Sequence, residues 1–317
     1  MGFIGKRLTV TILTLFLVSI ITFAAFRIIP GDAALVSLGT EATQEQIDAL
    51  RAELRLDRSL PVQYFSWLRD LLTGQLGYSA RFRGAPISGM ILERLPVTFS
   101  LAALSFLFII LIAVPVSIFS VKKENSIISR LVTTLTAQMI SMPGFFLGIL
   151  FIWIFGIIFR LFVPGAYVCY REDFTSFLAY LVFPALAIAL PNAALVIKFL
   201  RASIFREFQS DYARTAMSKG GSRAHVLRRH VLKNASLPVI TLLGMIAGEI
   251  LAGSIVIEQV FGIPGIGRLL LTSITARDFQ MIETLMIYIA FVVIMANTLA
   301  DIVLQIIDPR IRLEEKV

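Results

Sequence analysis

Residues 97–121 read VTFSLAALSFLFIILIAVPVSIFSV, a continuous stretch without a charged side chain. A helix rises 1.5 Å per residue, so about 20 mostly apolar residues cross the roughly 30 Å of hydrocarbon in a bilayer. Five more runs of this kind lie around it: Leu8–Phe26, Leu131–Phe159, Phe177–Ile197, Val239–Val260 and Met281–Ile307. The sequence therefore predicts an all-α membrane protein with six transmembrane helices.

The composition of the whole chain agrees with this prediction. Of its 317 residues, 57% are hydrophobic and 16% are charged, against roughly 45–50% and about 25% in soluble domains. A single cysteine, Cys169, excludes an internal disulfide framework and a multi-cysteine metal site. The net charge of +8 favours an anionic partner. Because the basic residues lie beside the apolar runs, we expect that partner to be membrane lipid and not nucleic acid.

The lysines predict the orientation, because cytoplasmic loops of membrane proteins are enriched in Lys and Arg. With the N-terminus inside, every lysine falls on the cytoplasmic side: Lys6, Lys122, Lys123, Lys198, Lys219, Lys233 and Lys316. We therefore expect both termini in the cytoplasm. The first apolar run is longer than a signal-peptide core and lacks a small-residue cleavage site, so we expect it to remain as a helix.

These runs divide the chain into three parts. Residues 1–26 form the first transmembrane helix, residues 27–96 an outer subdomain, and residues 97–317 a core with five transmembrane helices. In the outer subdomain we expect a short helix over Thr43–Leu56, with Thr43 as its cap. This subdomain is either a structural lid or a docking surface for an outside partner, and the sequence leaves both open.

The inner loop, residues 198–236, predicts a rigid elbow. An apolar stripe at helical spacing runs along its first half, formed by Phe205, Phe208, Tyr212 and Ala216. Gly220-Gly221 ends that helix, because a left-handed terminus favours a residue without a Cβ. Ser222 caps a second helix that continues toward Pro238. Such an elbow lies on anionic lipid, connects two helices passively, or inserts into another protein.

Polar residues inside the apolar runs are the candidate functional residues of the core. An ionised side chain at the bilayer centre costs roughly 2.5–3.5 kcal/mol on insertion scales, so Glu249 is expected to face protein or water. Asn297 and Asp301 are four apart and share one helix face. Pro143 predicts a kink or a break in the third run. These four residues either line a translocation path or hold helices together.

Nucleotide-binding and metal-binding motifs are missing from the sequence. The glycine-rich stretch Gly262–Gly267 lacks the lysine and the serine or threonine of a phosphate loop, and we expect a tight outer turn there. If the protein uses ATP, another chain must bind it. His225 and His230 offer no third metal ligand nearby.

Six short motifs occur in order along nearly the whole chain. They are residues 29–32 (IPGD), 54–64 (LRLDRSLPVQY), 93–98 (ERLPVT), 141–145 (SMPGF), 211–220 (DYARTAMSKG) and 308–312 (DPRIR). Together they resemble the permease subunits of bacterial ATP-binding-cassette importers for dipeptides, oligopeptides and nickel. The resemblance implies the type I importer permease fold, in the cytoplasmic (inner) membrane of a bacterium.

Residues 211–220 resemble the ATPase-coupling loop of that family, whose general pattern is Glu-Ala-Ala, three residues and Gly. Here Arg214 and Thr215 replace the Glu and the first Ala, whereas Ala216 and Gly220 match. The later proline of the pattern would fall at Lys233. The resemblance implies that the helix inserts into a cytoplasmic ATPase subunit. The implied coupling residues are Asp211, Tyr212, Ala213, Arg214, Thr215, Ala216, Lys219 and Gly220.

The resemblance also implies the partners. These are a second homologous permease, two ATPase subunits that bind ATP and Mg²⁺, and an extracytoplasmic substrate-binding protein that docks near residues 27–96. The chain itself is then a transport subunit that binds no cofactor and is not an enzyme.

Short peptides are the expected substrate, and two other functions stay open. Nickel is one, in chelated form, because a bare-metal path would depend on methionines such as Met245, Met286 and Met295. A stand-alone ion-coupled carrier with Glu249 and Asp301 as proton relays is the other. An intramembrane hydrolase is disfavoured, since no Ser/His/Asp set shares one membrane depth.

Overall fold

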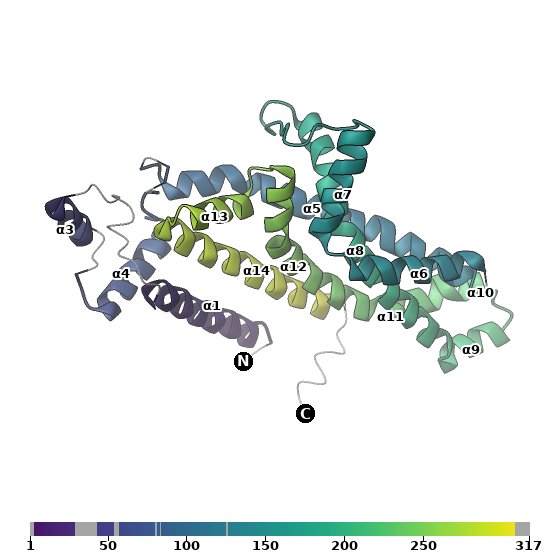
Figure 1. Ribbon diagram of the computed structural model, residues 1–317. Coiled ribbons are helices and arrows are strands. Elements are labelled where there is room, and N and C mark those ends of the chain that lie inside the picture. Colours follow the sequence, from purple (N-terminus) through teal and green to yellow (C-terminus); the bar gives the residue numbers. More distant parts are fainter. Residues whose placement is uncertain are drawn as a thin grey trace. The chain divides into compact units, whose positions relative to one another are not determined.

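The computed structural model describes residues 3–28, 43–53, 57–79, 81–82, 84–124 and 126–307. Over these residues the regular secondary structure is helical (Figure 1). One isolated β-bridge joins Tyr78 and Pro86. The predicted all-α fold is therefore confirmed for the described part of the chain. The chain divides into two compact units, one of Met1–Thr98 with Pro264–Ile294 and one of Phe99–Ile263 with Met295–Val317.

Four described helices are long and apolar enough to cross a membrane: Gly5–Ile28, Ile87–Lys122, Phe174–Phe208 and Phe279–Val303. Three pairs of shorter helices joined by sharp bends also qualify as pairs, which allows up to seven spans. The six predicted runs coincide with α1 (Phe3–Ile28), α5 (Ile87–Lys122), α6 to η1 (Ile127–Ile158), α8 (Phe174–Phe208), α12 (Leu237–Phe261) and α14 (Phe279–Ile307).

The third run is broken into two helices. α6 (Ile127–Ser141) ends before Met142. α7 (Gly144–Phe151) continues directly as the π-helix η1 (Ile152–Ile158), and this second segment is bent by 102° from α6. Proline lacks an amide hydrogen and disfavours the helical conformation in the residue before it. Met142 and Pro143 are accordingly extended. The predicted break at Pro143 is confirmed, and this run is not one straight helix.

α8 lies at the centre of the unit Phe99–Ile263, where it packs against α6, α7, α11 (Leu232–Ala235) and α12. Its buried positions include Ala185, Ala187, Ala189, Ala193 and Ala194. Such small side chains allow neighbouring backbones to approach closely. A Cβ on Gly144 of α7 would lie 3.2 Å from the carbonyl oxygen of Ala187. The first turn of α7 therefore rests on the backbone of α8.

Glycines four residues apart make three further close contacts in the same unit. A Cβ on Gly148 of α7 would lie 3.1 Å from the Phe261 ring of α12. On α12 itself, Gly244 and Gly248 face the last part of α14. There an added Cβ would lie 2.5 Å from the Cβ of Ala300 and 2.7 Å from Oδ1 of Asn297, respectively. This spacing is typical of membrane helices that pack through small residues.

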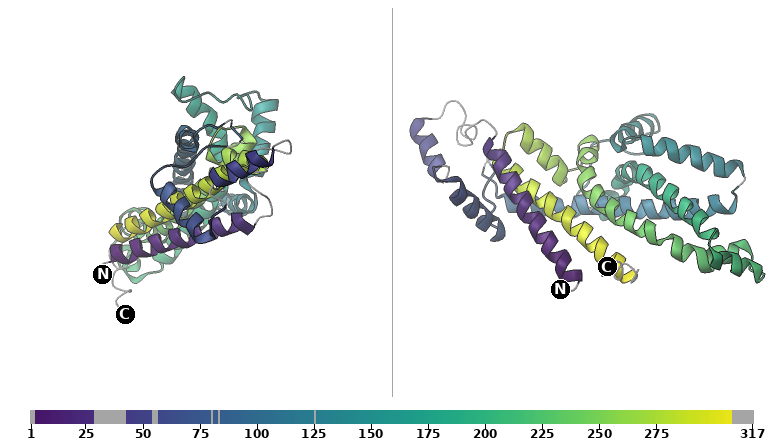
Figure 2. Two further views of the ribbon diagram at one scale, coloured as in Figure 1. Left: turned by 90° about the vertical axis from the view of Figure 1, so that its left-hand side faces the viewer. Right: turned by 90° about the horizontal axis from the view of Figure 1, so that it is seen from below.

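In the unit that contains the N-terminus, α1 runs beside α4 (Leu60–Leu72) and the first part of α14 (Figure 2). Ser19 and the hydroxyl of Tyr64 are 2.7 Å apart. Arg27 donates to Gln63 of α4 at 3.0 Å and pairs with buried Glu283 of α14 at 3.3 Å. One arginine thus joins three helices.

The described part of residues 27–96 contains the expected short helix. α3 spans Gln44–Glu53, and the Thr43 hydroxyl accepts a hydrogen bond from the backbone N–H of Gln46 at 3.4 Å. The predicted cap is therefore confirmed, while residues 54–56 of the predicted helix lie outside the described residues.

α13 (Ile266–Thr275) was not predicted from the sequence, which indicated a tight turn at Gly262–Gly267. Gly262 does end α12 in a left-handed conformation, at φ 72°. Four residues later α13 begins, and its first N–H donates to the Thr98 hydroxyl at 2.9 Å. Its buried residues Ile266, Leu269, Leu270 and Ser273 have helical spacing. This spacing of apolar residues is the feature of the sequence from which the helix could have been predicted.

We expect Gly244→Val to lower the thermal denaturation midpoint of the detergent-purified protein. The valine would overlap Ala300 on α14, and overpacking of this kind costs about 1–3 kcal/mol. Gly253→Ala on the same helix is the matched control, since a Cβ there meets nothing within 4 Å and alanine is the better helix former. Equal midpoints for Gly244→Val and the wild type would contradict the close contact.

Candidate functional site

The central part of the elbow, residues 211–226, is built around the short helix α9 (Asp211–Ser218). α8 ends at Phe208, and Gln209 and Ser210 separate it from α9. The predicted apolar stripe is therefore not on one helix: Phe205 and Phe208 belong to α8, Tyr212 and Ala216 to α9. Sequence spacing alone did not reveal the two-residue break, because the apolar period continues across it.

α9 exposes most of its side chains and is anchored at its first turn. Ala213 is fully buried, whereas Asp211, Arg214 and Thr215 are exposed. The Tyr212 hydroxyl donates to the Glu207 carboxylate of α8 at 2.5 Å. The pKa of Tyr212 is raised above its usual value, mainly by partial desolvation and to a smaller degree by this hydrogen bond. The tyrosine is therefore a neutral donor that holds α9 against the end of α8.

The glycine pair after α9 has two different structural roles. Gly220 adopts φ 89°, the left-handed conformation that the sequence predicted, and the space that a Cβ would enter there is open. Gly221 is packed: a Cβ there would lie 2.8 Å from the carbonyl oxygen of Ala216 and 3.1 Å from Val226. α9 and the next helix are thus in direct contact across the turn.

The second arm of the elbow starts with α10 (Arg223–Val226), which is capped as predicted. The Ser222 hydroxyl accepts from the His225 N–H at 3.3 Å. The helix continues as η2 (Leu227–Val231) and α11, which bury Leu227, Val231 and Ala235. η2 and α11 both pack on α8. The segment Arg223–Ala235 then meets α12 at a bend of 50°.

Arg223 connects this arm to two other segments of the same unit. Its Nη2 lies 2.5 Å from Oε2 of Glu124, which follows α5, and its guanidinium carbon lies 5.1 Å from the ring centroid of Phe208. Sequence reasoning missed this contact, because Glu124 and Arg223 are far apart in the chain and no local pattern links them.

The four polar candidates of the core occupy different environments. Glu249 is exposed on a face of α12, and among the described residues the structure shows no polar partner for it. The same face carries Thr241, Met245, Gly253 and Val256. Asn297 packs against Gly248, Asp301 is half-buried, and Pro143 is the N-cap residue that precedes α7. The structure therefore brings Asn297, but not Glu249, into a described helix contact.

The two histidines of residues 198–236 lie close together but do not form a metal site with other residues in the described part of the chain. His225 and His230 have ring centroids 6.4 Å apart. No group of three or more His, Cys, Asp or Glu side chains with metal-binding geometry occurs among the described residues.

Several long apolar helices, together with an exposed, glycine-terminated elbow, define a multi-pass membrane protein. Comparison with known families is more specific. Residues 113–313 match the family described as the inner membrane component of binding-protein-dependent transport systems, and residues 1–102 match the N-terminal part of such components. The chain belongs to this family, as its motifs predicted.

Curated relatives match over almost the full chain. The probable peptide ABC transporter permease protein y4tP of Sinorhizobium fredii is 33% identical, with 98% of this chain and 99% of the relative aligned. A putative peptide permease protein of Brucella suis is 35% identical over 96% and 97%. The oligopeptide transport system permease protein AppB of Bacillus subtilis is 30% identical over 98% and 99%.

Family membership establishes the general function and location. The protein is a multi-pass component of the cytoplasmic membrane and a permease subunit of an ABC transporter. Such a subunit works with ATPase subunits and with a substrate-binding protein.

Proposed function

We propose that this chain is the translocation subunit of an ATP-driven importer of short peptides. The observation that carries the proposal is the alignment, over nearly the whole chain, with relatives named as peptide and oligopeptide permeases. In the proposed complex a second homologous permease completes the path, and two ATPase subunits bind ATP and Mg²⁺. A binding protein delivers the peptide from outside.

The proposed topology has six spans with both termini inside: α1, α5, the broken α6–α7–η1 run, α8, α12 and α14. The position of every lysine supports it. α5 and α8 have 36 and 35 residues, and only about 20 are needed to cross the hydrocarbon. Both helices therefore extend beyond the bilayer, which allows α8 to carry the elbow into the cytoplasm. Residues 27–96 then lie outside, near the binding protein.

α9 is the proposed coupling helix, with Asp211, Tyr212, Arg214, Thr215 and Lys219 as the side chains available to an ATPase subunit. It is short, exposed, and fixed at both ends by the Tyr212–Glu207 bond and the Gly221 contact. A helix held in this way moves as a rigid body. ATP-driven closure of the ATPase subunits would displace α9, and its two arms would pass the displacement to α8 and α12.

The exposed face of α12 is the proposed wall of the translocation path. Glu249 on this face would cost roughly 2.5–3.5 kcal/mol if it met lipid, so water in the path or the second permease must cover it. Asn297 and Asp301 are assigned to helix packing, because Asn297 fits against Gly248. Pro143 shapes the α6–α7 bend.

The substrate is tested with the complete transporter reconstituted in liposomes. We expect uptake of labelled tripeptides that requires both ATP and the cognate binding protein, with no stimulation of ATPase activity by a nickel chelate. Chelate uptake without peptide uptake would overturn the peptide assignment. Uptake by this chain alone, driven by an ion gradient, would show a carrier instead.

The coupling function of α9 is tested by charge reversal. We expect Arg214→Glu to reduce ATP-dependent uptake about tenfold or more, since reversing a charge at an interface creates repulsion, while membrane insertion stays normal. Gly220→Val should act in the same direction, because φ 89° is strained for a β-branched residue. Arg214→Lys, which keeps the charge, is the control. Wild-type uptake in both test variants would refute the coupling function.

The position of Glu249 is tested by thiol labelling in a Cys169→Ser background. We expect Glu249→Cys to react with a membrane-impermeant maleimide in at least one nucleotide state, because water reaches the proposed path. Ser105→Cys is the control and should stay unlabelled, since Ser105 is fully buried in α5. Absence of labelling of Glu249→Cys in every nucleotide state would exclude a water-lined wall.

A further inference from the structure

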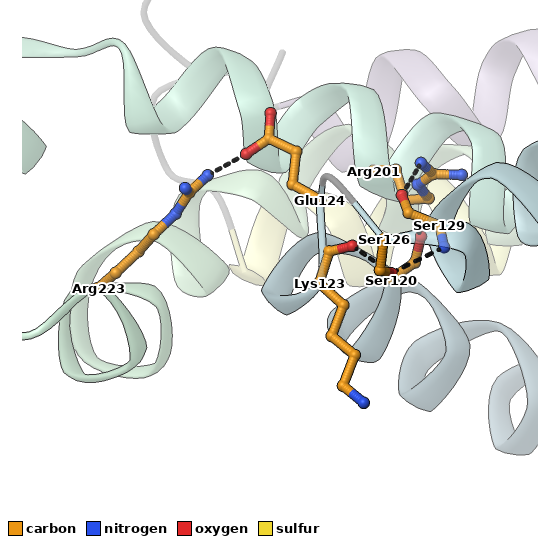
Figure 3. Close-up of polar contacts among 7 residues, drawn as sticks. All are labelled: Ser120, Lys123, Glu124, Ser126, Ser129, Arg201 and Arg223. Carbon is orange, nitrogen blue, oxygen red and sulfur yellow. Dashed lines mark hydrogen bonds and ion pairs between the residues drawn. The ribbon is translucent and has the colours of Figure 1, made fainter.

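The α5–α6 turn, described at residues 122–124 and 126, is short and fixed by its own hydrogen bonds (Figure 3). The carbonyl oxygen of Lys123 accepts from the Ser126 N–H at 3.0 Å and from the Ser126 hydroxyl at 2.6 Å. The same hydroxyl accepts from the Ser129 N–H at 3.3 Å and caps α6. These bonds tie Lys123, which directly follows α5, to the first turn of α6.

Arg223 joins this turn to the elbow. Its guanidinium makes two contacts at once: Nη2 pairs with Glu124, and the guanidinium carbon lies over the Phe208 ring. Lysine cannot make these two contacts in the same way. Glu124, Arg223 and Phe208 belong to the α5–α6 turn, to α10 and to the end of α8, respectively. The Arg223 side chain thus connects the α5–α6 turn with α10 and the end of α8, the two helices that flank α9 in the chain.

A second contact lies further along the same helices. Arg201 of α8 donates to the hydroxyls of Thr133 at 2.9 Å and Ser129 at 3.1 Å, both on α6. Ser129 is in turn 3.3 Å from the hydroxyl of Ser120 on α5, and both serines are buried (Figure 3). The inner ends of α5, α6 and α8 are therefore connected through hydroxyl groups, independently of the ion pair.

We propose that the α5–α6 turn is a second mechanical contact of the elbow, and that Arg223 is the positioning residue that passes the displacement of α9 to α5 and α6. The proposal rests on the proposed coupling function of α9. A shift of α10 away from the turn would break the 2.5 Å pair with Glu124, and in this proposal the pair keeps the two segments aligned while α9 moves. An exposed ion pair adds little stability by itself, which makes transmission and not folding the expected effect.

The motion is tested by hydrogen exchange of the complete transporter, with and without a non-hydrolysable ATP analogue. In the wild type we expect protection to change both around residues 211–226 and around residues 122–126. In Arg223→Glu the elbow should still respond and the turn should not. The reciprocal exchange Glu124→Arg/Arg223→Glu should restore the response of the turn. A turn that responds equally in all variants, or in none, overturns the proposal.

Transport gives a second readout, as peptide imported per ATP hydrolysed. Each single reversal should lower it about threefold or more, the scale of a lost exposed ion pair, and Arg223→Glu also loses the cation–π contact with Phe208. The double variant should recover at least half of the wild-type value. Lys233→Glu makes the same charge change as Arg223→Glu at an exposed side chain of α11 and should have no effect. A double variant as poor as the singles would refute positioning by this pair.

The two proposals fail in different ways. If no variant, wild type included, imports peptide, the peptide-importer function falls, and the exchange measurements still decide the role of the turn. If peptides are imported and the turn does not follow the elbow, only the inference about Arg223 falls.

Discussion

The structure depends on close backbone contact between helices at small residues. Lipid tails are as apolar as leucine, so burial of apolar side chains does not draw membrane helices together as it does in water, and packing must supply the attraction. Gly144 and Gly148 place α7 against α8 and α12, and Gly244 with Gly248 place α12 against the end of α14. The alanines of α8 provide the opposing surface. These contacts fix the direction of α12, and with it the face that presents Glu249.

Polar contacts have a different role. They connect segments near helix ends, where apolar packing between the helices is less extensive. Arg27, Arg201 and Arg223 each join at least two helices or turns within one unit. Their partners are mainly hydroxyls and carboxylates at helix ends. Such pairs contribute modestly to stability, since desolvation offsets most of the electrostatic gain. Their geometry is nevertheless directional, and this makes them suited to keep the elbow aligned with the segments around it.

Much of the fold was predictable because its determinants are local in sequence. Apolar runs indicated the long helices, Pro143 the break, and Gly220 and Ser222 the limits of the elbow. The break at Ser210 was missed because the apolar period passes through it, and α13 because its glycine-rich start indicated a turn. Contacts between distant segments, such as Glu124 with Arg223 or Gly244 with Ala300, leave no mark in a single sequence. The function of Glu249 stays a prediction for the same reason, since it depends on what covers its face.

The joint at Pro143 changes how stiffness is distributed along the third run. A helix resists bending through its ladder of backbone hydrogen bonds. Here that ladder stops with Met142 N–H to Met139 and resumes with Phe146 N–H to Pro143, so among the described residues no backbone bond of the ladder bridges the junction. The angle between α6 and α7 is set instead by the close contact of Gly144 with the backbone carbonyl oxygen of Ala187 on α8. How easily this junction bends therefore depends on the surface of α8. Substitutions on that surface would change the angle between α6 and α7 without altering either helix.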